Sequence, residues 1–129
     1  MSIHIKEIAF VYHPVADIAR AREFYGKVLG LKTGLEIEFG GGAWWIEYDV
    51  AGIALAVSNA GPPATGGGAT LALEVASIDD ALAAIAAAKV PVTLEVQEFP
   101  PCRMFIIGSP DGHAIMLHQR KAAHPAPAA

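Results

Sequence analysis

The chain has 129 residues, 53% of them hydrophobic and 17% charged, which is too apolar for a disordered protein and long enough for one compact domain with its own core. The net charge of −4 is spread along the chain without a basic stripe, so nucleic acid is not an expected partner. No apolar run reaches the roughly 18–20 residues of a membrane-spanning helix, so a membrane is not an expected partner either.

The first half of the sequence predicts a strand, a helix and three further strands. A strand-like run covers residues 5–12, and a helix is expected over residues 17–29. Asp17 is a good N-cap because its carboxylate can accept a backbone N–H of the first turn, and Gly30 suits a left-handed C-cap. The three strand-like runs that follow cover residues 32–39, 43–50 and 52–58.

The second half predicts the same order of elements. A strand is expected over residues 70–75, and a helix from Ser77 to about Lys89, where Pro91 prevents its continuation. Ser77 and Asp80 form a pair similar to a capping box at the start of this helix. The last three strands are expected over residues 92–99, 102–108 and 113–119.

A constant shift of 60 residues superimposes the two halves without a gap. The superimposed pairs include Asp17 and Ser77, Trp45 and Phe105, Ile46 and Ile106, and Gly52 and Gly112. Few residues are identical, but shared caps and turn glycines indicate a repeat. We therefore expect a single α+β domain over residues 1–120, built from two βαβββ modules in tandem.

The boundaries within this domain follow from composition. The first module is expected over about residues 4–58 and the second over about residues 69–119. Residues 59–68, rich in glycine and proline, form the expected linker, and residues 121–129, rich in alanine and proline, form an expected disordered tail. The segment at residues 1–7 lacks the pattern of a secretory signal, so a cytoplasmic protein is expected.

Three features resemble the vicinal oxygen chelate superfamily, which includes glyoxalase I, bleomycin- and fosfomycin-resistance proteins and extradiol dioxygenases. Residues 15–18 (Val-Ala-Asp-Ile) and 24–31 (Phe-Tyr-Gly-Lys-Val-Leu-Gly-Leu) resemble the opening motif of this family. Residues 109–113 (Ser-Pro-Asp-Gly-His) resemble its characteristic turn, and the doubled order of elements resembles its paired modules. The resemblance implies the fold but not the reaction, since this fold carries several activities.

The resemblance also implies four positions for metal ligands, in the first and last strand of each module. In this sequence those positions are Phe10, Ala56, Thr70 and Met116. A divalent metal in such a site prefers imidazole nitrogen or carboxylate oxygen, and none of these side chains offers either. Cys102 is the only cysteine, which excludes a cysteine-based metal cluster. The resemblance therefore points to a member without the metal site and without a cofactor.

The candidate site residues follow from strand alternation, because residues two apart share a side of a strand. The candidate catalytic residues are His118, Glu47 and Glu74, and the candidate ligand-binding residues are Phe10, Tyr12, Trp45, Thr70, Arg103, Phe105 and Met116. Of the third strands, Trp45, Glu47, Arg103 and Phe105 are expected to face a cavity between the modules. Plainer interpretations stay open: His118 as a partly exposed histidine, the glutamates as structural partners of Arg103 or of a backbone donor, Arg103 as a surface charge, and the aromatic residues as packing.

The favoured functional hypothesis is a glyoxalase-like protein of the metal-free branch that binds a small organic molecule between its modules. The alternative is a lyase, isomerase or dioxygenase-type enzyme that uses His118 with Glu47 or Glu74, with or without an atypical divalent metal. A third alternative is a regulatory or scaffold module whose pocket is vestigial. The resemblance also implies a homodimer.

Overall fold

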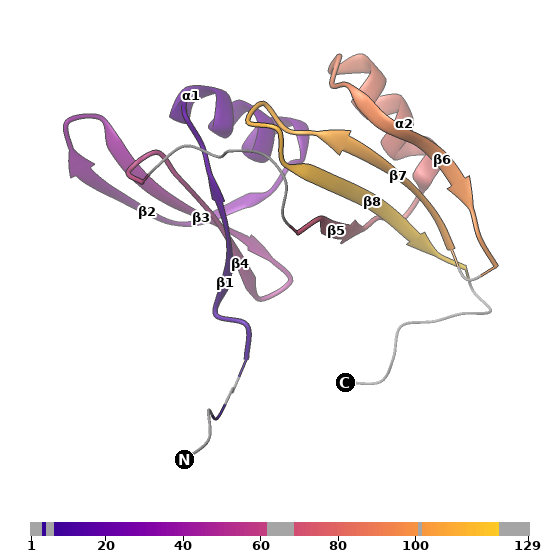
Figure 1. The fold of residues 1–129 in the computed structure, drawn as a ribbon, viewed down its shortest axis with the longest axis horizontal. Helices are drawn as coiled ribbons and strands as arrows, with labels where there is room; N and C mark the ends of the chain where they lie inside the picture. The colour runs from indigo at the N-terminus through magenta and orange to yellow at the C-terminus, as the bar shows by residue number, and fades with distance from the viewer. Residues whose placement is uncertain (1–3, 5–6, 62–68, 101, 122–129) are drawn as a thin grey trace. The chain divides into compact units, whose positions relative to one another are not determined.

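The computed structural model describes residue 4 and residues 7–61, 69–100 and 102–121. The chain divides into two compact units, Met1–Thr65 and Gly66–Ala129. Each contains a four-stranded sheet and one helical segment between its first and second strands (Figure 1). The predicted α+β fold of two tandem βαβββ modules is confirmed. None of the described helices is long and apolar enough to cross a membrane.

The first unit follows the predicted order of elements. Its elements are β1 (Phe10–Pro14), α1 (Ile18–Ala21), η1 (Arg22–Val28), β2 (Lys32–Gly40), β3 (Ala43–Val50) and β4 (Ile53–Ser58). The strand order in the sheet is β1-β4-β3-β2, with β1 parallel to β4 and the other neighbours antiparallel. Strand β1 begins later than residue 5 because its partner strand β4 begins only at Ile53, and the first pair between the two strands joins Phe10 to Ala54.

The predicted first helix divides into two kinds of turn. The Asp17 carboxylate accepts the N–H of Arg20 at 3.1 Å, which confirms the predicted N-cap. After one α-helical turn the segment widens into a π-helix, in which the N–H of Leu29 bonds to the carbonyl of Phe24. A π-helical turn holds more residues than an α-helical one, so this segment accommodates an additional residue.

The helical segment packs on one face of the first sheet, called here the helix-side face. Phe24 and Tyr25 from the helix are buried there with Ile46 and Tyr48 from β3. The Tyr25 hydroxyl lies 2.8 Å from Nδ1 of the buried His13, and the Tyr25 and Tyr48 rings are stacked. Burial raises the pKa of Tyr48 above its ordinary value, as expected for a hydroxyl in this core.

The second unit repeats the arrangement. Its elements are β5 (Leu71–Glu74), α2 (Ile78–Ala87), β6 (Val92–Glu98), β7 (Cys102–Gly108) and β8 (Ala114–Arg120). The strand order is β5-β8-β7-β6, again with the first and last strands of the unit parallel. The Ser77 hydroxyl caps α2 by accepting the N–H of Asp80, and the side chain of Gln119 accepts the N–H of Ile78.

The repeat holds at a shift of 60 for the outer parts of each unit. The β1–β4 pairs Val11–Leu55 and Pro14–Ser58 recur as the β5–β8 pairs Leu71–Ile115 and Glu74–His118. The N–H of Val15 bonds to the carbonyl of Ser58, and the N–H of Val75 bonds in the same way to the carbonyl of His118. Sequence superposition therefore predicts these strands in their true register.

The hairpins between them require a correction, because β2–β3 and β6–β7 match at a shift of 59. The pairs Thr33–Tyr48 and Leu35–Glu47 recur as Val92–Ile107 and Leu94–Ile106. The first unit has one more residue before its hairpin, where the π-helix lies. The second unit has one more residue in the turn before β8. The pair Asp49–Ala54 corresponds there to Gly108–Ala114, so the shift returns to 60 at the start of β8. A slip of one residue turns every side chain of a strand to the opposite face.

The predicted linker and tail fall largely outside the described residues. Residues 62–68 of the linker and residues 122–129 of the tail are not described. The division between the two units lies inside the segment predicted as the linker. A single domain over residues 1–120 stays a prediction.

Candidate functional site

The first sheet carries a cluster of aromatic rings on its helix-free face, the face opposite its own helical segment. Strand register places Phe10 and Tyr12 of β1 on this face with Trp45 and Glu47 of β3. The Trp45 ring stacks on Tyr12 with centroids 5.3 Å apart and meets the Phe10 ring edge to face at 5.5 Å. Such pairs contribute about 0.5–1.5 kcal/mol each beyond the area that they bury. We call these four residues the aromatic cluster.

Small residues of β4 make this cluster possible. Strand β4 lies between β1 and β3, and its residue opposite both Tyr12 and Glu47 is Ala56. Ala56 is fully buried although it is on the helix-free face. Since alanine leaves room above the sheet, the rings from the two flanking strands can meet across it.

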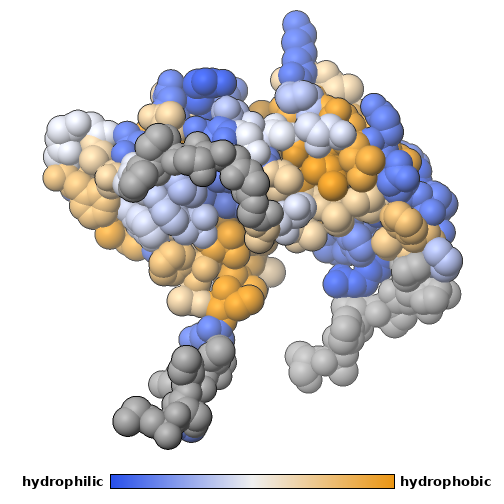
Figure 2. All heavy atoms as spheres, viewed as in Figure 1, coloured by the Kyte–Doolittle hydropathy of each residue, from blue (hydrophilic) through white to orange (hydrophobic). Residues whose placement is uncertain are grey.

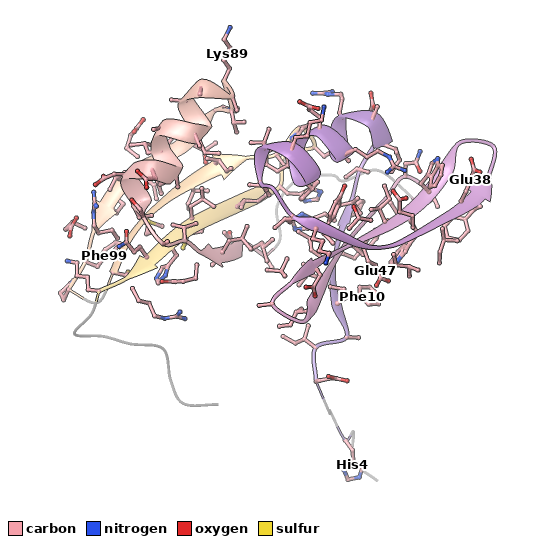
Figure 3. The ribbon with its side chains drawn as sticks, turned by 180° about the vertical axis from the view of Figure 1, so that it is seen from behind. His4, Phe10, Glu38, Glu47, Lys89 and Phe99 are labelled. Carbon is pink, nitrogen blue, oxygen red and sulfur yellow. The ribbon has the colours of Figure 1, made fainter. Side chains whose placement is uncertain are left out.

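Glu47 is held beside the rings by a direct hydrogen bond. The Trp45 Nε1–H donates to Oε2 of Glu47 at 2.8 Å. The two residues are two apart on β3, so the bond fixes the indole and the carboxylate on the same side of the strand. Figure 3 shows Phe10 and Glu47 on the side of the first sheet away from its helical segment.

The aromatic cluster is accessible and lies among other exposed apolar residues. Phe10 is 44% exposed and Tyr12 37% exposed. Leu35 and Ile37 of β2 stand opposite Glu47 and Trp45, which puts them on the same face, and both are exposed. Figure 2 shows apolar residues gathered over the end of the first unit where β1 and β4 begin. Apolar and aromatic side chains with a small number of polar groups are the chemical make-up of many small-molecule sites.

The second sheet carries a carboxylate–imidazole pair on its own helix-free face. Nδ1 of His118 lies 2.7 Å from Oε1 of Glu74, on neighbouring strands β8 and β5. The other carboxylate oxygen of Glu74 accepts the backbone N–H of Arg120 at 2.6 Å, and the Arg120 guanidinium lies 3.4 Å from Oε1. These contacts hold the carboxylate, which in turn orients the histidine ring.

The environment of Glu74 favours its ionised form. Partial burial alone would raise the pKa of Glu74, but the Arg120 backbone N–H, the His118 ring and the Arg120 charge together lower this pKa below the ordinary value of a glutamate. With Glu74 ionised, Nδ1 of His118 is the donor in their hydrogen bond. Nε2 is then the ring nitrogen that this contact leaves available for another hydrogen bond.

Two predicted ligand-binding residues lie on the wrong face of the second sheet. Phe105 is fully buried, and its pairing with Leu117 puts it on the helix-side face rather than beside Met116 and His118. Arg103 is on that same face, where it contacts Asp79 of α2 at 3.3 Å and Glu98 of β6 at 3.0 Å. The expectation that both residues face a ligand was wrong because β7 matches β3 at a shift of 59.

The same register identifies residues that sequence reasoning missed. Met104 stands opposite His118 and Ile106 opposite Met116, so they occupy the helix-free face in place of Arg103 and Phe105. Met104 and Ile106 carry no sequence signal other than the true register of β7. Arg120 was also missed, although its position two residues after His118 on the same strand was a usable signal. The remaining predicted position, Thr70, is exposed and immediately precedes β5.

Comparison with known families identifies the fold family. The model of the Glyoxalase/Bleomycin resistance protein/Dioxygenase superfamily matches residues 5–117. The chain belongs to this superfamily. No curated protein sequence matches it.

Several solved structures share the fold. TioX from Micromonospora sp. ML1 superimposes with a TM-score of 0.72 at 20% identity, covering 90% of this chain and 100% of TioX. The fosfomycin resistance protein FosX from Listeria monocytogenes superimposes with a TM-score of 0.76 at 14% identity, covering 94% of this chain and 98% of FosX. Lactoylglutathione lyase from Agrobacterium tumefaciens superimposes with a TM-score of 0.70 at 16% identity, covering 89% of this chain and 94% of the lyase. At these identities the similarity establishes the fold and not the activity.

The residues of this chain do not fit the divalent metal of some superfamily members, such as the FosX complex with Mn(II). Phe10 and Ala56 lie on the helix-free face of the first sheet and Met116 on that of the second, and none of them carries an imidazole or a carboxylate. Among the described residues, no group of three or more histidines, cysteines, aspartates or glutamates could hold a metal ion.

Proposed function

We propose that this superfamily member binds a small organic molecule on the helix-free face of its first sheet. The observation that carries the proposal is the aromatic cluster, in which Phe10 and Tyr12 contact Trp45 beside Glu47. Rings on a rigid sheet offer a large contact area at little cost in conformational entropy. The carboxylate supplies one polar group that can orient a ligand.

The two tryptophans of the chain allow a direct test. Trp45 belongs to the aromatic cluster, whereas Trp44 lies on the opposite face, where the Arg22 guanidinium stacks on its ring at 4.9 Å. Trp44→Phe and Trp45→Phe each leave a single tryptophan as a fluorescent probe. We expect a panel of planar aromatic fragments to change Trp45 emission saturably in the Trp44→Phe variant and to leave Trp44 emission unchanged in the other.

The outcome decides the proposal. Saturable binding that is lost in Trp45→Ala, with the unfolding midpoint of the variant known from urea titration, supports a site at the cluster. Equal responses from both single-tryptophan variants would indicate non-specific binding. No response from Trp45 to any fragment would overturn the proposal.

A second candidate function, an acid–base enzyme, is favoured by one observation on the second sheet. The 2.7 Å contact between Glu74 and His118, with Glu74 fixed by Arg120, is the arrangement that orients a histidine for proton transfer. This supports the pairing of His118 with Glu74. Glu47 belongs to the other unit, so its pairing with His118 stays a prediction.

Turnover separates the two candidates. Each fragment that binds is incubated with the wild-type protein and followed by NMR for chemical conversion or for exchange of carbon-bound hydrogen. An enzyme requires conversion that is strongly reduced in His118→Ala while ligand affinity is kept. Conversion unchanged in His118→Ala would exclude this histidine as the base, and binding without conversion would leave the binding function alone.

The remaining expectations from the sequence concern assembly and location. We propose that the protein forms a homodimer, which light scattering coupled to size-exclusion chromatography would test. A ligand cavity between the modules and a cytoplasmic location stay predictions.

A further inference from the structure

We propose that the ligand of the aromatic cluster is an organic cation, such as a quaternary or protonated amine. This inference rests on the proposed function and names the chemical class of its ligand. It is carried by Glu47, a half-buried carboxylate that lies beside aromatic rings and accepts a hydrogen bond from the neutral indole of Trp45.

Glu47 is half-buried and has a neutral partner. Its hydrogen bond comes from the indole N–H of Trp45, and among the described residues no basic side chain forms an ion pair with it. Among the described residues, several other acidic side chains contact cationic ones. These pairs are Glu23 with Lys27, Glu36 with Arg22, Glu74 with Arg120, Asp79 with Arg103, and Glu98 with Arg103 and Lys121.

The described strand residues that pair with Glu47, Leu35 and Ala56, carry no charge. Among the described strand residues on this face, the basic residue is Lys32. It stands opposite Asp49 rather than Glu47. Strand β4 contributes only small uncharged residues, Ala54, Ala56 and Ser58, to the same face. A carboxylate removed from water is stabilised by a positive partner, and a bound cation would provide it.

The rings around Glu47 favour the same class of ligand. The faces of tryptophan, tyrosine and phenylalanine rings carry negative electrostatic potential and attract cations within about 6 Å of the ring centre. Trp45 and Tyr12 stack beside the carboxylate, and Phe10 meets Trp45 edge to face. Several rings with one carboxylate is the environment in which proteins recognise alkylated ammonium groups. An anionic ligand would be repelled by Glu47 and by the ring faces alike.

Choline and its neutral carbon analogue, in which a carbon atom replaces the nitrogen, provide a test that changes charge alone. The readout is the indole N–H signal of Trp45 in isotope-labelled full-length protein, because this proton lies in the hydrogen bond to Glu47. The indole signal of Trp44, on the opposite face, is the internal reference. We expect choline to shift the Trp45 signal saturably and to bind about tenfold more tightly than the neutral analogue, a difference within the range of cation–aromatic attraction combined with one carboxylate.

Two variants with the same change of charge locate the effect. Glu47→Gln keeps an oxygen that can accept the Trp45 N–H but removes the charge, so we expect it to lose most of the preference for choline. Asp49→Asn removes a charge two residues further along the same face of β3 and is the matched control. It keeps an oxygen that can accept the N–H of Gly52, as Asp49 does, and we expect it to leave the preference within about twofold because exposed charges are screened.

The outcomes separate this inference from the proposed function. Equal affinity for choline and its neutral analogue, or a preference unchanged in Glu47→Gln, would overturn the cationic ligand. Equal losses in Glu47→Gln and Asp49→Asn would overturn the specific role of Glu47. If planar uncharged fragments shift the Trp45 signal and choline does not, the binding function stands and this inference fails. If neither does, both fail.

Discussion

The two units are alike on their helix-side faces and different on their helix-free faces. Both helix-side faces are closed by a helix that begins at a side-chain cap, Asp17 in the first unit and Ser77 in the second. Both have two alternate residues of the third strand fully or almost fully buried, Ile46 and Tyr48 in one, Phe105 and Ile107 in the other.

The helix-free faces share almost no chemistry. Trp45 in the first sheet corresponds to Met104 in the second, and Ser58 corresponds to His118. The first face is aromatic with one carboxylate, and the second combines thioethers with a carboxylate–imidazole pair. The comparison shows that the repeated fold constrains the residues against the helix, whereas the opposite face is available for separate functions.

The sharpest test of this division is the substitution of one aromatic residue from each face. Phe105→Ala opens a cavity in the core, so we expect a loss of about 3–5 kcal/mol in the free energy of unfolding. Trp45→Ala removes a partly exposed ring, so its loss should be clearly smaller while ligand binding is lost. Urea titration followed by circular dichroism measures both. A milder effect at Phe105 than at Trp45 would contradict the assignment of the two faces.

The equivalence of the two helix starts is tested by removing each cap. Asp17→Ala and Ser77→Ala each leave a backbone N–H of the first turn without its acceptor, and we expect each to cost about 1 kcal/mol. The same urea titrations provide the values. Asp17→Asn, which keeps an accepting oxygen, is the control and should stay close to wild type. A large loss at only one of the two caps would show that the helices contribute differently to their units.

The turns before the last strands differ, and this difference predicts a stabilising substitution. In the short turn between β3 and β4, Ala51 and Gly52 both have positive φ, 50° and 90°. Positive φ is unfavourable for alanine and not for glycine, whereas glycine also makes the unfolded chain more flexible. We expect the net effect of Ala51→Gly to be an increase of about 0.5–1 kcal/mol in the free energy of unfolding. Thermal unfolding would show a higher midpoint. Gly52→Ala should lower it, and a gain there would contradict the turn geometry.

The smallest expected effect concerns the pH dependence of the second unit. Because the pKa of Glu74 is lower in the folded than in the unfolded state, its interactions stabilise the fold above the unfolded value of about 4.3 and are lost as pH falls through the folded value. The Glu74 side chain is 41% exposed, so solvent screening limits this contribution to about 0.2–1 kcal/mol.

Glu74→Gln isolates this contribution from the other carboxylates. At about pH 7 the variant should be less stable than wild type by the stated amount, and the difference should disappear at a pH below both pKa values. Urea titrations of the two proteins at several pH values measure it. A difference that persists unchanged below both pKa values would contradict the direction of the pKa shift.

Local signals predicted most of the fold. Asp17, Ser77 and the turn glycines act over a few residues, so their sequence patterns identified the helices and turns correctly. Strand alternation likewise placed Phe10, Tyr12, Trp45 and Glu47 on one face, because their strands keep the expected pairing. The same rule named Glu74 and His118 as candidates without deciding whether Glu47 or Glu74 meets the histidine, and the contact between Glu74 and His118 came from the structure.

The part that could not be predicted depends on register. Arg103 and Phe105 were assigned to the wrong face because the hairpin β6–β7 is displaced by one residue relative to its counterpart. Register is determined by turn length and by the pairing of distant strands, neither of which a gapless superposition of the two halves detects. The role of Arg120 was missed for a different reason, because the last strand was expected to end at residue 119, whereas β8 continues to Arg120 and brings its backbone N–H and its guanidinium to Glu74.

The displaced hairpin also has an evolutionary consequence. After a duplication, one copy can gain or lose one residue before a hairpin and compensate for it by one residue in the turn after the hairpin. The side chains of both hairpin strands then exchange faces of the sheet. The flanking strands and the helix cap keep their places, as the shared β1–β4 and β5–β8 pairs show. Two small length changes can thus give a copied module a new surface at once, where point substitutions would need many steps.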